Sequence, residues 1–146
     1  MVRILIVDDF EIVRRNVCRL LASEPDFEVV SQAASGVEAI KEAERYQPDV
    51  ILLDISMPEL NGLAATPLIK KVAPNSKVLI VSNHANAGFV REALSAGALG
   101  FISKADLGAE IVSAVRKVNN NESFLGKSLA RSKDIPPTSE PATGAE

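Results

Sequence analysis

The chain has 146 residues, of which 47% are hydrophobic, so it is long and apolar enough for one domain with a buried core. Sixteen Lys and Arg against 19 Asp and Glu give a net charge of −3, which argues against direct nucleic-acid binding. The single cysteine, Cys18, excludes an internal disulfide and fits a reducing compartment. No apolar stretch approaches the roughly 18 residues that span a bilayer, and the charged start is unlike a secretion signal, so we expect a cytoplasmic chain without a membrane partner.

Short apolar runs bounded by turn residues predict five strands, at residues 3–7, 27–31, 49–53, 78–81 and 99–103. Most of these runs are rich in Ile, Leu and Val, which is typical of strands buried on both faces in a parallel sheet. Stretches with the period of an amphipathic helix lie between the strands. The pattern is therefore βα repeated about five times, and it predicts an α/β fold.

Capping and stop signals predict where the first two helices begin and end. Apolar residues recur on one helical face between residues 11 and 22, and Asp9 is the expected N-cap. Ser35 and Glu38 form a capping box for the next helix, and Pro48 follows the end of that helix.

A proline complicates the prediction of where the third helix begins. Pro67 is tolerated in the first turn of a helix but not in its interior, so we expect either Thr66 as the N-cap of the third helix or a kinked helix. The fourth helix is predicted at residues 87–95 with Gly97 at its C-terminal end, and the fifth helix is predicted to open at Asp106.

The compact part is expected to end near Phe124, which gives one domain over residues 1–124. From Lys127 onward Pro, Ser, Thr, Ala, Gly and Glu predominate, and too few apolar residues remain to pack. We therefore expect residues 125–146 to form a flexible tail or a linker to another domain.

Four of the predicted strands end in polar residues. Asp8 and Asp9 follow the first strand, Asp54 the third, Ser82 the fourth and Lys104 the fifth. In open parallel sheets the ligand lies beyond the carboxyl ends of the strands, where the strand order reverses. These side chains are thus expected to share one site.

The residue types at these strand ends favour a metal-assisted phosphoryl site. Three neighbouring carboxylates repel one another unless a cation is bound or one acid stays protonated, and oxygen ligands without nearby His or Cys suit Mg2+ best. Asp8 and Asp9 would hold the metal, while Asp54 would be both ligand and nucleophile, forming an acyl phosphate. Lys104 would offset the negative charge of the transferring group, and Ser82 would donate a hydrogen bond to it after transfer.

With these residues in place, the chain resembles the receiver domains of bacterial two-component response regulators. Asp8 and Asp9 match the acidic pair of the family, Asp54 its phosphoacceptor, Ser82 its switch hydroxyl and Lys104 its lysine. The segments VDD, LLDISMPELNGL and GFISK agree as well. The resemblance covers about residues 2 to 120 and implies a flavodoxin-like (βα)5 three-layer sandwich with strand order 2-1-3-4-5.

The resemblance also implies a function. A histidine kinase or phosphotransfer protein would phosphorylate Asp54 with Mg2+, and the chain would be a phosphoacceptor rather than an enzyme. Phe101 matches the switch aromatic of the family, which turns inward as Ser82 moves toward the phosphoryl group. The face of the fourth helix, fifth strand and fifth helix would then meet a partner, with a homodimer as one possibility. Ser56 and His84 match positions that tune water access to the acyl phosphate, and by analogy Ser56 offers its backbone carbonyl to the metal.

Two features of the family pattern bear on output and local geometry. The segments LSAGALGFISKADL and VNNNESFL look most like regulators that carry a C-terminal helix-turn-helix DNA-binding domain, which implies transcription regulation by a domain outside these 146 residues. A stand-alone receiver is the open alternative.

Ala105 replaces the proline that many relatives have after Lys104, so the isomer of this peptide bond is left open.

The same residues allow other interpretations. Asp8 and Asp9 alone would suit helix caps, and Phe101 alone would suit plain core. A phosphatase with an aspartyl nucleophile is expected to carry a second acid two residues later, where Ser56 stands. A nucleotide-binding module would need a Gly-rich turn after the first strand. The remaining alternative is an interaction module with a receiver fold that is not phosphorylated, against which the full set of matched residues argues.

Overall fold

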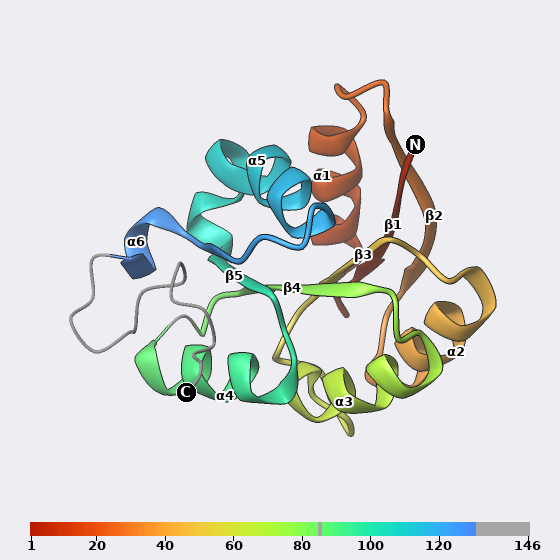
Figure 1. The fold of residues 1–146 in the computed structure, drawn as a ribbon, viewed down its shortest axis with the longest axis vertical. Helices are drawn as coiled ribbons and strands as arrows, with labels where there is room; N and C mark the ends of the chain where they lie inside the picture. Colours follow the sequence, from red (N-terminus) through yellow and green to blue (C-terminus); the bar gives the residue numbers. More distant parts are fainter. Residues whose placement is uncertain (85, 131–146) are drawn as a thin grey trace.

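The structure is a computed structural model that describes residues 1–84 and 86–130 (Figure 1). The strands are β1 (Val2–Val7), β2 (Phe27–Ala33), β3 (Val50–Leu53), β4 (Lys77–Ser82), β5 (Gly100–Ser103) and β6 (Phe124–Leu125). The helices are α1 (Glu11–Leu21), α2 (Gly36–Tyr46), α3 (Gly62–Val72), α4 (Ala87–Ala96), the 3-10 helix η1 (Lys104–Asp106), α5 (Leu107–Asn119) and α6 (Lys127–Ala130).

The strands form one parallel sheet with the order β2-β1-β3-β4-β5-β6. The chain first builds outward from β1 to β2 and then crosses back to β3, so the strand order reverses beside β1. This arrangement confirms the predicted flavodoxin-like fold and its order 2-1-3-4-5. The short sixth strand was not predicted.

Helices cover both faces of the sheet, which makes three layers (Figure 1). Leu5, Ile51 and Ile80 belong to the core cluster that includes buried residues of α2, α3 and α4. Their neighbours along the strands, such as Leu52 and Leu79, pack in the second cluster with residues of α1 and α5. Successive side chains of a strand point to opposite faces, so strands that are apolar at every position fill both layers.

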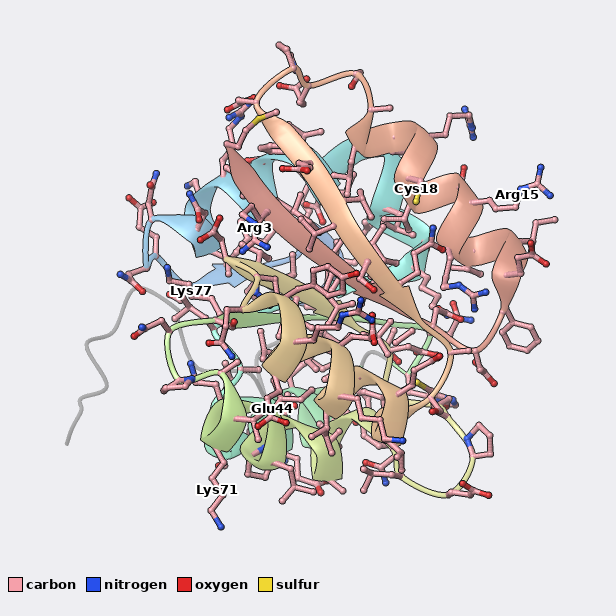
Figure 2. The ribbon with its side chains drawn as sticks, turned by 90° about the vertical axis from the view of Figure 1, so that its right-hand side faces the viewer. Arg3, Arg15, Cys18, Glu44, Lys71 and Lys77 are labelled. Atoms are coloured by element: carbon pink, nitrogen blue, oxygen red, sulfur yellow. The ribbon has the colours of Figure 1, made fainter. Side chains whose placement is uncertain are left out.

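Cys18 lies on α1 (Figure 2), is partly buried and packs against the second cluster. Burial raises the pKa of its thiol, and the nearby Arg14 opposes this effect. A thiol with a raised pKa is a poor nucleophile, which suits a packing role.

The caps of the first two helices differ in how well they were predicted. The N-cap of α1 is Phe10, not Asp9, because the Asp8 carboxylate accepts the backbone N–H of Phe10 at 2.9 Å and closes the loop itself. The capping box of α2 is confirmed: Ser35 Oγ accepts the backbone N–H of Glu38 at 3.1 Å.

Of the two alternatives expected for α3, the one with Thr66 as the N-cap is wrong. The helix begins at Gly62, and the Asn61 side chain caps it by accepting the backbone N–H of Ala64 at 2.9 Å. Pro67 consequently lies inside the helix, where it is exposed. The Thr66 hydroxyl donates instead to the carbonyl of Gly62 at 2.7 Å.

The C-terminal part extends further than expected. The helix α4 ends as predicted at Gly97, whose φ of 112° lies in the left-handed region that glycine adopts at low cost. Beyond Phe124 the chain continues into β6 and α6, and Leu129 is only 4% exposed. The packed part therefore extends past the expected boundary at residue 124, because Leu125 and Leu129 pack against the first core cluster. The rest of the expected tail, residues 131–146, lies outside the described residues.

Across the described ranges, 1–84 and 86–130, none of the helices has the length and apolar character needed to cross a membrane.

Candidate functional site

The carboxyl ends of β1, β3, β4 and β5 form one edge of the sheet, and polar side chains gather there. Asp8 follows β1, Asp54 follows β3, Ser82 ends β4 and Lys104 follows β5. Parallel pairing aligns these ends, with Val7 beside Leu53 and Ser82 beside Ser103. The sequence-predicted residues thus come from four strands and converge beside the reversal of strand order.

Three carboxylates make an acidic cluster. Asp8, Asp9 and Asp54 each present one oxygen atom, and these atoms lie within 4.8 Å of one another. Asp8 and Asp54 are each 3% exposed. Asp9 Oδ1 is buried without a hydrogen-bond partner in the part of the chain that the structure describes. A buried carboxylate oxygen that lacks a hydrogen-bond donor and lies close to oxygens of two further carboxylates is suited to bind a hard cation. The three carboxylates therefore fit Mg2+.

Lys104 faces this cluster. Its Nζ lies 2.6 Å from Asp8 Oδ2 and 3.5 Å from Asp54 Oδ2. The Ser103 hydroxyl accepts the backbone N–H of Ala105 at 3.2 Å and caps the 3-10 turn that carries Lys104. No cis peptide bond occurs among residues 1–84 and 86–130, so the Lys104–Ala105 bond is trans.

The pKa of Asp54 is raised to about 6. Burial is the largest cause, and the neighbouring charges of Asp8 and, to a smaller extent, Asp9 add to it. Lys104 and a hydrogen bond from the Ser56 backbone lower the pKa and partly offset these effects. Asp54 is thus ionised at neutral pH at a considerable electrostatic cost, and a bound cation would reduce that cost.

Ser82 and Phe101 are both fully buried. Ser82 Oγ accepts the backbone N–H of His84 at 3.0 Å, so the hydroxyl oxygen is engaged by its own loop. Phe101 lies on β5, paired with Ile80 on one side and Leu125 on the other, and belongs to the α2–α4 core cluster.

Ser56 and His84 lie on the rim of the site. Ser56 is exposed in the loop after Asp54, and its backbone contacts the Asp54 carboxylate. His84 is exposed after β4, and its ring lies 5.7 Å from the ring of Phe89, centroid to centroid.

Two supporting residues were not identified from the sequence. A Cβ atom on Gly62 would lie 2.1 Å from the carbonyl oxygen of Asp54, so only glycine allows α3 to approach this loop. Arg14 donates to the carbonyl of Asp8 at 2.7 Å and to Gln32 at 3.2 Å. The Asn61-Gly62 pair signalled a loop in the sequence, whereas nothing local marks Arg14, because its partners depend on the fold.

Comparisons with known proteins show the family of this chain. The family model for the response regulator receiver domain matches residues 4–116. The transcriptional regulatory protein DegU of Brevibacillus brevis is 38% identical over 124 residues, which cover 85% of this chain and 52% of DegU. The response regulator protein VraR of Staphylococcus aureus is 40% identical, with 85% of this chain and 59% of VraR covered. The chain thus spans somewhat more than half the length of these relatives.

Solved structures of receiver domains are similar as well. The response regulator domain of Thermotoga maritima CheB has a TM-score of 0.77 at 36% identity, covering 82% of this chain and 97% of that domain. A LuxR-family response regulator from Aurantimonas has a TM-score of 0.85 at 31% identity, covering 88% and 92%. Fold, site and sequence together define a signalling receiver domain. The chain belongs to the receiver domain family of two-component response regulators.

Proposed function

We propose that Asp54 accepts a phosphoryl group from the phosphohistidine of a histidine kinase or phosphotransfer protein. The observation that carries this proposal is the placement of Asp54: its buried carboxylate shares a cluster with Asp8 and Asp9 and faces the Lys104 ammonium at 3.5 Å. A carboxylate held among ligand oxygens and opposite a cation is suited to attack a phosphoryl group.

In the proposed reaction an Asp54 carboxylate oxygen forms a bond to phosphorus as the bond from phosphorus to the donor imidazole nitrogen breaks. The imidazole keeps the electron pair of that bond and takes up a proton from solvent if it leaves in the anionic form. The product is an acyl phosphate on Asp54. Lys104, which pairs with Asp8 and Asp54 in the unmodified protein, offsets the negative charge on the phosphoryl oxygens. Ser82 would donate its hydroxyl hydrogen to one of these oxygens, and Phe101 would respond to that movement.

Asp8, Asp9 and Asp54, with the backbone carbonyl of Ser56, are the residues we propose for binding Mg2+. When bound, Mg2+ screens the carboxylates from one another and from the incoming phosphate. The buried, unpartnered Oδ1 of Asp9 supports this assignment, since that atom lacks a donor among the described residues.

We propose a phosphoacceptor rather than an enzyme that turns over a separate substrate. A phosphatase would need an acid to protonate its leaving group, and the exposed residue two positions after Asp54 is Ser56. The alternative is an interaction module that is not phosphorylated. The convergence of Asp8, Asp9 and Lys104 on Asp54 argues against it, because neighbouring carboxylates repel one another and cost stability unless a cation binds there.

The proposed setting is cytoplasmic signalling with transcription regulation as the output. DegU, a relative, is described as a transcriptional regulatory protein, and this chain spans 52% of it. With a net charge of −3, this chain itself is not proposed to bind DNA. Its protein partners would be the phosphoryl donor and, after phosphorylation, a second copy of the chain.

The test is incubation with acetyl phosphate and Mg2+ followed by intact mass spectrometry. We expect a gain of one phosphoryl group in the wild type, no gain in Asp54→Asn, and loss of the gain with EDTA. Asp26→Asn is the matched control, because Asp26 is a half-exposed partner of Arg116 and should gain the group like wild type. Equal gain in Asp54→Asn and wild type would refute the assignment of the acceptor, and no gain in the wild type would favour the inert module.

A further inference from the structure

The segment after α5 returns to the sheet and pairs with β5. We call residues 124–129 the C-terminal latch. Gly126 donates its backbone N–H to the carbonyl of Phe101 at 2.9 Å, and Phe124 donates to the carbonyl of Leu99 at 3.3 Å. The pairing is parallel, with Phe101 opposite Leu125. The latch therefore occupies the edge of β5 that would otherwise be open at the rim of the sheet (Figure 1).

Two glycines allow this close approach. A Cβ on Gly100 would lie 3.2 Å from the carbonyl oxygen of Phe124, and it would also crowd Leu79 at 2.8 Å. A Cβ on Gly126 would lie 3.0 Å from Glu110 Oε1. Gly100 on β5 and Gly126, just after β6, thus lie where a larger residue would crowd the latch.

Side chains hold the latch from two directions. The Glu110 carboxylate on α5 accepts the backbone N–H of Lys127 at 2.8 Å. Leu129 is 4% exposed and packs in the same core cluster as Phe101. The docked state thus combines backbone pairing, one charged hydrogen bond and one buried leucine.

The strand β5 connects the latch to the acidic cluster. Phe101 pairs with the latch, and three residues later Lys104 forms ion pairs with Asp8 and Asp54. A phosphoryl group on Asp54 would add negative charge beside Lys104 and change the partners of the ammonium. Packed cores shift between discrete arrangements rather than deforming smoothly. A displacement of β5 would therefore change the packing of Leu129, which lies in the same core cluster as Phe101.

We propose that docking of the C-terminal latch is coupled to phosphorylation of Asp54: the latch is docked in the unmodified protein and loosened in the phosphorylated protein. This inference rests on the proposed function. The structure has Lys104 paired to Asp8 and the latch docked, and we assign this docked state to the unmodified site. Coupling between two sites is reciprocal, hence weakening the latch must favour phosphorylation.

The first test is hydrogen exchange measured by mass spectrometry on the full chain, with and without acetyl phosphate and Mg2+, and with intact mass recorded on the same samples. We expect amide exchange in the peptide spanning residues 122–130 to be at least about fivefold faster after phosphorylation, the low end of typical couplings. If phosphorylation proceeds and exchange in this peptide is unchanged, the latch proposal is overturned while the proposed function stands. If no phosphoryl group is gained, both fall.

The reciprocal test uses Leu129→Ala, with Leu68→Ala as the matched control. Leu68 is 41% exposed on α3, so the same truncation there leaves the latch intact. We expect Leu129→Ala to speed exchange of the 122–130 peptide in the unmodified protein and to tighten the binding of beryllofluoride with Mg2+, a mimic of the phosphoryl group, about fivefold, with Leu68→Ala like wild type. Faster exchange with an unchanged affinity for beryllofluoride would show an uncoupled latch and contradict the proposal.

A second variant guards against a general loss of folding in Leu129→Ala. Gly126→Val places a side chain against Glu110 Oε1 and the Ile102 backbone, where a Cβ alone would lie at 3.0 and 3.3 Å, so it should loosen the latch without removing any core residue. Faster exchange of the 122–130 peptide reports that loosening, and the same rise in affinity for beryllofluoride is expected with it. A rise in Leu129→Ala but not in Gly126→Val would trace the effect to the core rather than to the latch and would overturn the inference.

Discussion

The Nζ atom of Lys104 lies 2.6 Å from Asp8 Oδ2, closer than to the carboxylate that we propose as the phosphoacceptor. In the structure the lysine thus pairs more closely with Asp8 than with Asp54, from which its Nζ is 3.5 Å away. A divalent cation and the ammonium would compete for Asp8. Binding of the metal would therefore release Lys104 toward Asp54 and the incoming phosphoryl group.

This competition leads to an expectation for Lys104→Met, which keeps the length of the side chain and removes its charge. We expect Mg2+ to bind roughly fivefold more tightly, about 1 kcal/mol, because the competing cation is gone. Phosphorylation by acetyl phosphate should nevertheless be slower, since the charge on the phosphoryl oxygens loses a counter-ion. Isothermal titration calorimetry and a phosphorylation time course check the two effects separately.

Lys77→Met is the matched control for this experiment. Lys77 begins β4 (Figure 2), so it belongs to the amino end of the strand rather than to the edge that carries the acidic cluster. Its Mg2+ affinity and phosphorylation rate should match wild type. Weaker Mg2+ binding in Lys104→Met would show that the lysine organises the acidic cluster rather than competing with the metal.

The pKa of Asp54 predicts a pH-dependent stability of the metal-free protein. This pKa is about 6 in the folded chain against an ordinary value of 3.8, so between these pH values the folded state binds more protons than the unfolded state. Rising pH in that window lowers the free energy of unfolding. Asp54→Asn should therefore be more stable than wild type at pH 7, on the order of 1–3 kcal/mol, with the difference shrinking toward pH 4.

Urea unfolding in EDTA at pH 4, 5, 6 and 7 checks this expectation. Saturating Mg2+ serves as the internal control, because it should stabilise wild type more than Asp54→Asn and narrow the gap at pH 7. A difference in stability that is constant across these pH values would mean that Asp54 does not titrate in the expected window.

Gly62 should be indispensable for the loop that carries Asp54. A Cβ there would lie 2.1 Å from the Asp54 carbonyl oxygen, so Gly62→Ala should lower the free energy of unfolding by roughly 3 kcal/mol. Gly108 on α5 has open space around it, and Gly108→Ala should be neutral or stabilising by up to about 1 kcal/mol. Chemical denaturation of both variants measures the contrast, and equal effects would contradict the close approach.

Ser56 and His84 should affect the lifetime of the acyl phosphate rather than its formation. Both residues are exposed, Ser56 two positions after Asp54 and His84 two positions after Ser82. A side chain at these positions can admit or obstruct the water that hydrolyses the acyl phosphate. We expect Ser56→Asn and His84→Ala to change the decay rate severalfold while the extent of phosphorylation by excess donor is retained. Decay followed by intact mass after removal of the donor tests this, and unchanged decay in both variants would refute it.

Ser82 alone should not drive a complete switch. Its hydroxyl oxygen now accepts the His84 backbone N–H, and a new hydrogen bond to a charged phosphoryl group contributes roughly 1.5–3 kcal/mol. Moving an equilibrium from 1:99 to 99:1 needs about 5.5 kcal/mol. We therefore expect dimerisation to supply part of the remainder, so beryllofluoride with Mg2+ should raise the dimer population in sedimentation experiments. Identical populations with and without beryllofluoride would argue against this contribution.

The parts of the fold that follow from local pattern were predicted correctly. The apolar strands, the Ser35–Glu38 box and the Gly97 helix end each depend on residues adjacent in sequence. The α3 start was missed because it is set by a distant contact: Gly62 packs against the Asp54 backbone, and this fixes Asn61 as the cap despite Pro67.

The acidic cluster was predictable for a different reason. Parallel strands align their carboxyl ends, so polar residues that directly follow them must converge whatever the loops do. The ion pair of Lys104 with Asp8, the Arg14 contact and the docking of Leu129 were not predictable, because each depends on side-chain positions from separate elements. The Asp9 cap was wrong since Asp8 closes that loop through Phe10.

The central claim is that the phosphoryl group resides on Asp54. After incubation with acetyl phosphate and Mg2+, reduction with borohydride converts an aspartyl phosphate to homoserine, and tandem mass spectrometry of the peptides locates the converted residue. The account predicts homoserine at position 54 in samples with Mg2+ and none with EDTA. Homoserine at another aspartate, or unconverted Asp54 in a protein that has gained the phosphoryl group, would contradict it.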